Sequence, residues 1–320
     1  MTTTNAPTDR FTVQVTSVRQ VADAVLEVTF GHPARQSLPP WHPGAHIEIQ
    51  LPSGLSRQYS LCGDASDEAS YTIAVLREEH GRGGSRELHR IVCAGSQFDV
   101  RAPRNDFTLV EADSYLFVGG GIGITPLIPM INEVQKRGSQ WSLVYGGRTR
   151  TSMAYHDRLQ ALGKQVDIWI ESERGYPDLT SIQAAARPGT MVYACGPGAM
   201  IDAVAREFPH HPHLGGLHFE RFAASGPIDT SGGAFEVELR RTGVTFAVGE
   251  GGSILQEVHK VLPDHPFSCE EGYCGECETR VLDGQPDHRD NYLTADEQDT
   301  GDTMMICVSR CQGTRLVLDL

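Results

Sequence analysis

Long apolar runs and an excess of positive charge are both missing from this sequence. The least polar stretch, residues 116–131, is broken by four glycines and two prolines and is too short to span a bilayer. The formal net charge of -14 argues against the basic patch that nucleic-acid binding requires. The N-terminal residues show no positive region followed by an apolar run, so no secretory signal is expected. We therefore predict a soluble, cytoplasmic and monomeric protein without a membrane or nucleic-acid partner.

The clearest functional motif in the sequence is formed by cysteines. Cys269, Cys274 and Cys277 follow the spacing C-x4-C-x2-C, and Cys307 follows Cys277 after 29 intervening residues. This spacing is typical of a plant-type 2Fe-2S cluster, in which each iron takes two thiolates. The alternative is a structural zinc site, but zinc ligands usually form two separate knuckles, whereas here both spacings share Cys274. We predict that these four cysteines bind a 2Fe-2S cluster.

Residues 1–110 contain short β-rich runs separated by Gly, Pro and Asp. Such runs are typical of a small antiparallel barrel or sandwich. A helical pattern of comparable strength occurs once, at residues 85–92. The predicted strands are residues 11–15, 25–30, 46–51, 58–61, 71–75 and 97–102.

Two pieces of this region have the composition of a ligand site. On the strand that contains Arg57, Tyr59 and Ser60, the first two side chains share one face. A cation beside an aromatic ring suits a planar, phosphorylated ligand, although a solvated strand face is the alternative. The second piece, residues 81–85, reads Gly-Arg-Gly-Gly-Ser before a helical run, and Ser85 is expected to cap that helix. Backbone amides there suit a phosphate, although a simple glycine turn would have the same sequence.

From residue 111 to residue 222 the pattern changes to alternating strands and helices. Predicted strands at residues 115–118, 141–145, 166–170 and 191–194 alternate with helices at residues 127–136, 153–162, 180–186 and 199–208. This alternation predicts a parallel sheet with both faces covered. Ligands bind such sheets beyond the carboxyl ends of the strands. Two glycine-rich turns fall at such ends, residues 119–126 and 195–198.

The two turns are candidates for a dinucleotide site. The first, Gly-Gly-Gly-Ile-Gly-Ile-Thr-Pro, departs from G-x-G-x-x-G and so supports a pyrophosphate site only moderately. In the second, Cys195 is either a packed thiol or a cofactor contact. Arg148 and Arg150 follow another strand, where the adenosine end of a dinucleotide could lie, and a solvated surface turn is the alternative.

The last hundred residues begin with a glycine-rich, polar stretch. Residues 223–233 have the composition of a linker. Beyond them we predict a hairpin of residues 235–240 and 244–248, a helix over residues 252–262, and strands at residues 278–282 and 315–320. A small β-rich domain with one helix and a cysteine loop is the expected form of a ferredoxin.

With these motifs assembled, the whole chain resembles the phthalate dioxygenase reductase family, part of the wider ferredoxin-NADP reductase superfamily. The resemblance implies a multidomain α+β and α/β fold. Its parts would be an antiparallel FMN-binding β-barrel (1–110), a parallel-sheet NAD-binding domain (111–222), a linker (223–233) and a plant-type ferredoxin domain of β-grasp form (234–320).

The same resemblance implies roles for the residues of both ligand sites. Arg57 would contact the flavin phosphate, Tyr59 would pack on the ring system, and Ser60 would lie near N5. Thr125 would lie near the nicotinamide together with Cys195, and Phe222 would cover the flavin. The remaining FMN contacts would be Arg82, Gly83, Gly84 and Ser85, and the remaining nucleotide contacts would be Gly120, Gly121, Gly123, Arg148, Gly196 and Pro197.

The implied activity is electron transfer from NADH through FMN to the 2Fe-2S cluster and on to a Rieske-type oxygenase or O-demethylase. The sequence between residues 81 and 85 favours FMN over FAD, whereas Arg148 and Arg150 leave NADPH open. Two alternatives remain, a reductase of a cytochrome P450 and a redox sensor whose cluster reports rather than conducts. The acidic residues beside the cluster, Glu270, Glu271, Glu276 and Glu278, predict a partner with a basic docking patch.

Overall fold

The computed structural model describes residues 10–79, 81–222, 229–267 and 269–320. The chain divides into two compact units, residues 1–220 and 221–320, which are described separately below. Of the helices in the described ranges, none combines the length and the apolar character that a bilayer crossing requires.

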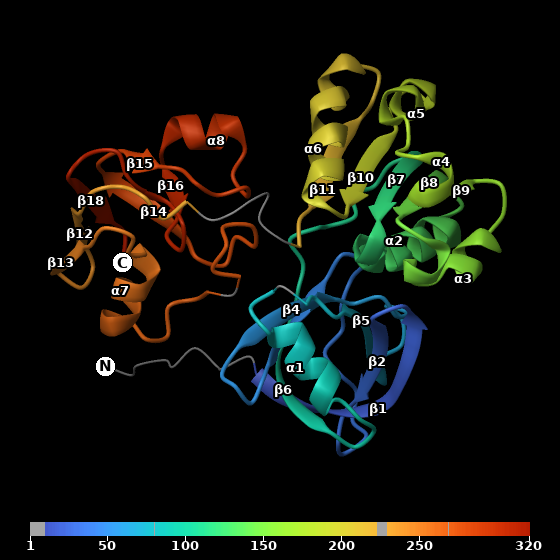
Figure 1. Cartoon of the computed structure of the whole chain (residues 1–320), viewed down its shortest axis with the longest axis horizontal. Coiled ribbons are helices and arrows are strands. Elements are labelled where there is room, and N and C mark those ends of the chain that lie inside the picture. The colour runs from blue at the N-terminus through green and yellow to red at the C-terminus, as the bar shows by residue number, and fades with distance from the viewer. Residues whose placement is uncertain (1–9, 80, 223–228, 268) are drawn as a thin grey trace. The chain divides into compact units, whose positions relative to one another are not determined.

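The first unit begins with a sheet of six antiparallel strands in the order β4-β3-β6-β1-β2-β5 (Figure 1). Leu61, directly after β4, forms a bridge with Ile73 of β5, so the sheet closes into a barrel rather than a sandwich. Alternate apolar side chains fill its interior, Val13, Val28 and Ile47 among them. The elements are β1 (Arg10–Ala22), β2 (Val25–Gly31), β3 (His46–Gln50), β4 (Ser56–Ser60), β5 (Ser70–Leu76), α1 (Gly84–Ile91) and β6 (Gln97–Arg104).

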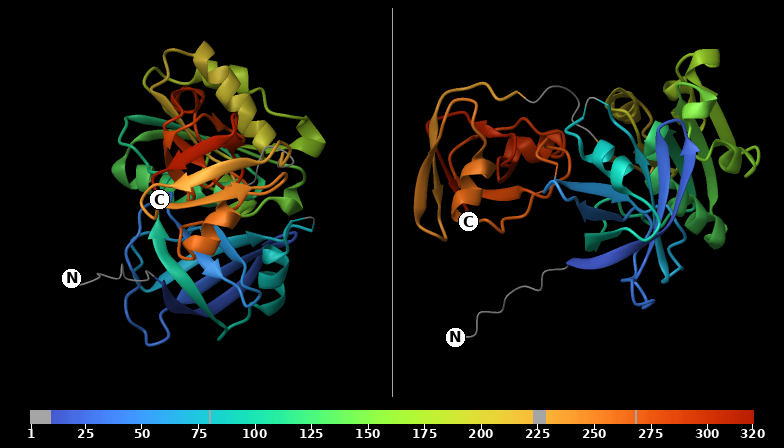
Figure 2. Two further views of the ribbon diagram at one scale, coloured as in Figure 1. Left: turned by 90° about the vertical axis from the view of Figure 1, so that its left-hand side faces the viewer. Right: turned by 60° about the horizontal axis from the view of Figure 1, so that its bottom comes forward.

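Strand β1 is much longer than the predicted run of residues 11–15, and it is the long blue strand in Figure 2. Its second half is polar and half exposed, so it lacks a strong apolar pattern. That half is held by pairing with β2 across a tight turn, where Ala24 adopts a φ of 57°. Pairing with a neighbouring strand therefore extends β1 beyond its apolar part.

The second sheet of the first unit is entirely parallel, in the order β11-β10-β7-β8-β9. Leu116 and Val118 of β7 pack on the face that Leu179 and Val204 of two helices cover. Helix α2 contacts β7, β8 and β10. The elements are β7 (Ser114–Gly120), η1 (Gly121–Gly123), α2 (Ile124–Arg137), β8 (Gln140–Gly147), η2 (Arg150–Ser152), α3 (His156–Gln160), β9 (Val166–Ile170), α4 (Glu171–Arg174), α5 (Leu179–Ala185), β10 (Met191–Cys195), α6 (Gly198–Glu207), η3 (Phe208–His210) and β11 (Gly216–Glu220).

The helix predicted over residues 153–162 is wrong as a continuous element. Tyr155 adopts a φ of 60°, which an α-helix does not allow, and only α3 follows it. The Tyr155 ring is buried and its hydroxyl lies 3.5 Å from Cys62 Sγ in the barrel. A tertiary contact thus breaks the helix that the apolar pattern favours. Two other differences are the start of α2 at Ile124 rather than at residue 127, and the added strand β11.

The second unit contains a mixed sheet in the order β13-β12-β18-β14-β16, with α7 packed against its core. β12 and β18 are parallel, while the other pairs are antiparallel. Two parallel central strands with a helix across them confirm the predicted ferredoxin fold of β-grasp form. The elements are β12 (Phe235–Leu239), β13 (Val244–Val248), α7 (Ile254–Val261), β14 (Glu278–Asp283), β15 (Pro286–Asp287), α8 (Ala295–Thr300), β16 (Thr303–Met305), β17 (Arg310–Cys311) and β18 (Arg315–Leu318).

Helix α7 begins two residues later than the prediction of residue 252. Ser253 remains extended because its hydroxyl donates to the carbonyl of Cys307 at 3.0 Å. The short elements β15, β16, β17 and α8 were not predicted. They contain two to six residues each, too few for an apolar period to be visible.

Candidate functional site

The two glycine-rich turns of the parallel sheet pack directly against each other. Strands β7 and β10 are neighbours, and Cys195 pairs in register with Gly119. A Cβ atom on Gly123 would lie 2.3 Å from the carbonyl oxygen of Cys195, and one on Gly196 would lie 2.9 Å from the backbone of Gly120. The connections after β7 and β10 run in opposite directions across the sheet. Parallel sheets bind ligands at the point where the direction of the connections reverses. Only glycines allow both turns to meet there.

Thr125 and Cys195 occupy this edge as buried side chains. Thr125 is in the first turn of α2, and its hydroxyl donates to the carbonyl of Ile122 at 2.9 Å, which fixes the shape of the turn. Burial, followed by the nearby Glu220 carboxyl, raises the pKa of the Cys195 thiol. A thiol in this state is an uncharged packing group rather than a nucleophile.

Glu220 is a residue of this edge that the sequence reasoning missed. It ends β11 and pairs in register with Cys195. Its Oε2 atom is buried and has no hydrogen-bond partner among the described residues. Burial, followed by the charge of Asp106, raises the pKa of Glu220 to about 8. Its position at the carboxyl end of a strand, within the segment that contains Phe222, was the available signal.

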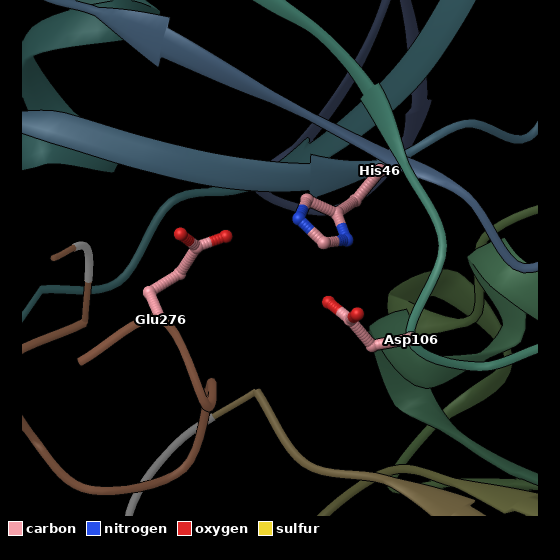
Figure 3. A group of neighbouring side chains, drawn as sticks. All are labelled: His46, Asp106 and Glu276. Atoms are coloured by element: carbon pink, nitrogen blue, oxygen red, sulfur yellow. The ribbon is translucent and has the colours of Figure 1, made fainter. Parts of the chain in front are cut away.

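Asp106 connects this edge to the barrel within the first unit. A carboxylate oxygen of Asp106 and a ring nitrogen of His46 lie within 4.8 Å of each other (Figure 3). His46 lies on β3 directly opposite Ser60 on β4. The barrel residue Ser60 and the sheet residue Glu220 are therefore joined through a series of neighbouring polar side chains. Glu276, the third side chain in Figure 3, belongs to the second unit.

The two predicted flavin motifs meet at the start of α1. A Cβ atom on Gly84 would lie 2.6 Å from Nε of Arg57, so the Arg57 side chain packs directly against this glycine. Tyr59 comes from the same strand, β4, and burial raises its pKa. Its hydroxyl is buried without a hydrogen-bond partner among the described residues. A planar ligand with polar edges would supply that partner, and this observation fits a flavin.

The prediction that Ser85 caps α1 is wrong. The N-cap is Gly83, with a φ of 97°, and no side chain caps the helix. The helix begins one residue earlier than expected, so the Ser85 hydroxyl lies inside its first turn and accepts a hydrogen bond from the Glu78 amide at 3.0 Å. Amides at the start of a helix that no side chain caps suit an anionic ligand such as a phosphate. Arg82 lies beside them in the exposed loop.

Of the two arginines after β8, one has a carboxylate partner. Nη2 of Arg150 lies 2.8 Å from Oδ1 of Asp157, and both side chains are exposed. Arg148 is also exposed, and its carbonyl accepts a hydrogen bond from the amide of Ser172 in α4 at 3.1 Å. Glu171 and Glu173 lie in the first turn of that helix. Arg150 is therefore paired with a carboxylate, whereas Arg148 lies on a loop that is hydrogen-bonded to a helix beginning with Glu171.

In the second unit the four predicted cluster ligands lie together. The Cys269 thiol neighbours those of Cys274 and Cys307, and the Cys307 thiol neighbours that of Cys277. These contacts lower the pKa of Cys269 and raise the pKa of Cys307. The amide of Glu271 donates to Cys269 Sγ at 3.3 Å. Adjacent thiols with amides directed at them fit the donor set of a 2Fe-2S cluster.

The cluster loop depends on two glycines and one buried carboxylate. Gly272 and Gly275 adopt φ values of 73° and 78°, and a Cβ atom on Gly275 would lie 2.5 Å from the ring of Tyr292. Asp290 was missed at sequence level because charged residues are rarely buried. It accepts hydrogen bonds from the Leu293 amide at 2.9 Å and from the Ser309 hydroxyl at 3.2 Å. Asp290 thereby fixes the segment that carries Tyr292.

Family models match two parts of the chain, an oxidoreductase NAD-binding domain at residues 117–206 and a 2Fe-2S iron-sulfur cluster binding domain at residues 237–312. The chain is 40% identical over 312 residues to phenoxybenzoate dioxygenase subunit beta of Ectopseudomonas oleovorans, covering 96% of this chain and 97% of that protein. It is 35% identical over 314 residues to phthalate dioxygenase reductase of Burkholderia cepacia, with shares of 96% and 97%. This chain belongs to the phthalate dioxygenase reductase family.

Solved structures agree with this membership. The crystal structure of phthalate dioxygenase reductase, described as modular for electron transfer from pyridine nucleotides to [2Fe-2S], has a TM-score of 0.76 at 34% identity. The match covers 97% of this chain and 98% of that one. An intact type IV self-sufficient cytochrome P450 monooxygenase has a TM-score of 0.84 at 40% identity, and the match covers 97% of this chain but 41% of that one. This member of the phthalate dioxygenase reductase family is thus an oxidoreductase with NAD-binding and 2Fe-2S domains, as the sequence predicted.

Proposed function

We propose that this oxidoreductase transfers electrons from NADH through FMN and a 2Fe-2S cluster to a Rieske-type oxygenase or O-demethylase. The observation that carries the proposal is that Cys274, Cys269, Cys307 and Cys277 form a series of neighbouring thiols. The relatives named as a dioxygenase subunit and a dioxygenase reductase support an oxygenase as the acceptor. The division into residues 1–110, 111–222, 223–233 and 234–320 and the cytoplasmic location stay predictions.

The barrel would hold the FMN. Arg57 and Arg82 would bind its phosphate together with the uncapped amides at the start of α1. Tyr59 would pack on the ring system, and its buried hydroxyl would gain a polar partner there. Ser60, which lies opposite His46, would approach the flavin N5 edge. The other predicted contacts, which lie on the same turn, are Gly83, Gly84 and Ser85.

The parallel sheet would hold the nucleotide at its carboxyl edge. Gly120, Gly121 and Gly123 would bring backbone amides to the pyrophosphate, together with Gly196 and Pro197. Thr125 and Cys195 would form the wall against which the nicotinamide rests, and a protonated Glu220 could donate a hydrogen bond to its carboxamide. Phe222, half-buried two residues after β11, stays our candidate for covering the flavin.

We also propose NADH rather than NADPH as the donor. A 2′-phosphate needs an arginine without a competing carboxylate. Arg150 is paired with Asp157, and the loop that carries Arg148 is hydrogen-bonded to α4, which begins with Glu171. A carboxylate in that position favours the 2′-hydroxyl of NADH and repels a phosphate.

The flavin, when bound, supplies the conversion that the reaction needs, because it accepts two electrons from a nicotinamide and gives them up one at a time. The residues of this chain would hold the two ligands, and Cys269, Cys274, Cys277 and Cys307 would supply the thiolates that bind the cluster. Plant-type clusters have reduction potentials of roughly -400 mV, which is low enough to reduce a Rieske centre or a haem.

The substitution Cys274→Ala tests the electron path. It should abolish NADH-driven cytochrome c reduction, which requires the cluster, while NADH-driven ferricyanide reduction by the flavin persists. Cys311→Ala is the matched control, because Cys311 lies four residues after the last ligand and outside the group of four. Full cytochrome c activity in the Cys274→Ala protein would contradict the proposed path. A redox sensor would show neither activity at a rapid rate.

A cytochrome P450 is the second candidate acceptor, because a self-sufficient P450 monooxygenase contains a region similar to the whole of this chain. The two candidates require the same reductase chemistry. NADH-driven turnover with a purified Rieske-type oxygenase, compared with turnover of a P450 under the same conditions, distinguishes them. Lower turnover at high salt would support docking through Glu270, Glu271, Glu276 and Glu278.

A further inference from the structure

Two arginines of the second unit hold a segment that the sequence assigns to the linker. Nη1 of Arg289 donates to the carbonyls of Asp229 and Ser231 at 2.8 and 2.7 Å. Nη2 of Arg310 donates to the carbonyl of Gly233 at 3.0 Å. Residues 229–233 are therefore bound mainly along their backbone, with one additional ion pair between Arg289 and the Asp229 carboxylate at 3.7 Å.

Both arginines are well placed to hold this segment rigidly. Arg310 is 3% exposed, and its guanidinium carbon lies 5.1 Å from the ring centroid of Phe235, the first residue of β12. The same guanidinium also donates to the carbonyl of Gly249 at 3.1 Å. Arg289 is 15% exposed, and its Nε donates to Asp287 at 2.9 Å. Side chains fixed at both ends lose little further entropy on binding the segment.

The arginines come from the part of the domain that surrounds the cluster loop. Asp287 of β15 pairs in register with Arg310 of β17, three residues after the cluster ligand Cys307. The Arg289 amide donates to the Ser309 hydroxyl at 3.2 Å, and Ser309 in turn donates to Asp290. The segment is thus fastened to the same hydrogen-bonded structure that shapes the cluster loop.

We propose that Arg289 and Arg310 form a clamp that shortens the tether of the ferredoxin domain and so sets the rate of flavin-to-cluster electron transfer. The inference rests on the proposed electron path. With the clamp closed, the chain between Glu220 and Asp229 spans at most roughly 30 Å, and with the clamp open, the chain between Glu220 and Phe235 spans roughly 50 Å. Effective concentration falls as about the three-halves power of tether length, so opening the clamp should lower it about twofold.

The clamp can be opened from both sides without removing the buried Arg310. Arg289→Met deletes the two bonds to the segment, and Gly232→Val acts on the segment itself. Gly232 has a φ of 123°, and a Cβ atom there would lie 3.2 Å from Nε of Arg310. Arg241→Met is the control, since Arg241 pairs with Asp319 at the surface.

The test uses the holoprotein of residues 1–320 and four measurements. In the Arg289→Met/Gly232→Val protein, the Ser231 amide, which donates to Oδ1 of Asp229 at 2.9 Å, should exchange at least tenfold faster, because the carbonyl bonds that order the segment around it are lost. The cluster EPR spectrum and midpoint potential should not change. The flavin-to-cluster rate in stopped-flow experiments should fall about twofold, and deleting residues 223–228 in the same background should restore it, because the tether length returns to its clamped value.

Three results would overturn the proposal. Unchanged exchange would mean that the arginines do not hold the segment in solution. A slower rate that the deletion does not restore would mean that tether length is not the cause. A changed EPR spectrum together with the slower rate would assign the arginines a structural role at the cluster. If NADH fails to reduce the cluster in the unaltered protein, the electron path itself is wrong, and the exchange measurement still reports on the clamp.

Discussion

The substitution Glu220→Gln gives a prediction whose size follows from the structure. Burial and the charge of Asp106 raise the pKa of Glu220 from 4.5 to about 8, so the folded protein holds a proton at pH 7 that the unfolded chain has lost. The contribution of this carboxyl to the free energy of unfolding is fully present below pH 4.5, its pKa in the unfolded chain. That contribution is lost as the pH rises through its pKa of about 8 in the folded protein. Between pH 6 and pH 9 the free energy of unfolding of the unaltered protein should fall by about 2 to 3 kcal/mol because of this group.

Urea unfolding of the first unit in the holoprotein, followed at pH 6, 7, 8 and 9, measures this loss. The Glu220→Gln protein keeps an uncharged group of the same shape, so its stability should lack this part of the pH dependence. The difference in free energy of unfolding between the two proteins should therefore shift by about 2 to 3 kcal/mol in favour of the variant as the pH rises from 6 to 9. Glu173→Gln is the control, because Glu173 is exposed on α4.

The same substitution should also change the pH profile of NADH-driven ferricyanide reduction. If a protonated Glu220 binds the carboxamide, kcat/KM for NADH should fall above about pH 8 in the unaltered protein and stay level in the variant. An equal stability difference between the two proteins at pH 6 and at pH 9 would refute the reasoning, because it would show that Glu220 is ionised in the folded state throughout.

Two further predictions concern the cluster loop and the nucleotide. Gly275→Ala should greatly reduce the iron content measured after purification, because its Cβ would lie 2.5 Å from the ring of Tyr292. Gly243→Ala is the control, because Gly243 has a φ of 72° but open space around it. That substitution should lower the free energy of unfolding by only about 1 to 2 kcal/mol and leave the cluster in place. For the nucleotide, kcat/KM should be at least tenfold higher with NADH than with NADPH, because one well-placed charged hydrogen bond is worth about that factor. A ratio near one would show that Arg148 binds the 2′-phosphate despite Glu171.

Motifs with a fixed spacing gave the clearest predictions from the sequence. The four cluster cysteines are defined by the coordination of two irons, and the glycines of both turns by the close approach of backbone to backbone. Apolar alternation located most strands of the first unit, although it missed β11 and the polar second half of β1. The order of the strands and the closure of the barrel through Leu61 could not be read from that pattern.

Residues whose role depends on tertiary neighbours were not predictable. Glu220 becomes a candidate only once β11 is placed beside β10 and Asp106 is brought close. Asp290 is ordinary in sequence and buried in the fold. Tyr155 stops a helix because its ring is required elsewhere, and Ser85 fails to cap α1 because Gly83 already turns the chain. For Glu220 and Tyr155 the deciding partners lie far away in the sequence, whereas Gly83 is only two residues from Ser85.

The contact between Tyr155 and Cys62 has a consequence for how this protein could be recombined with others. Cys62 follows the last residues of β4 in the barrel, and Tyr155 precedes α3 on the parallel sheet, yet each buries the other. A second link is the amide of Asp23 in the barrel, which donates to the carbonyl of Thr151 at 2.8 Å. A cut near residue 110 would expose these surfaces. The transplantable module is therefore the pair of sheets in residues 1–220, and engineered fusions should exchange that pair as one piece.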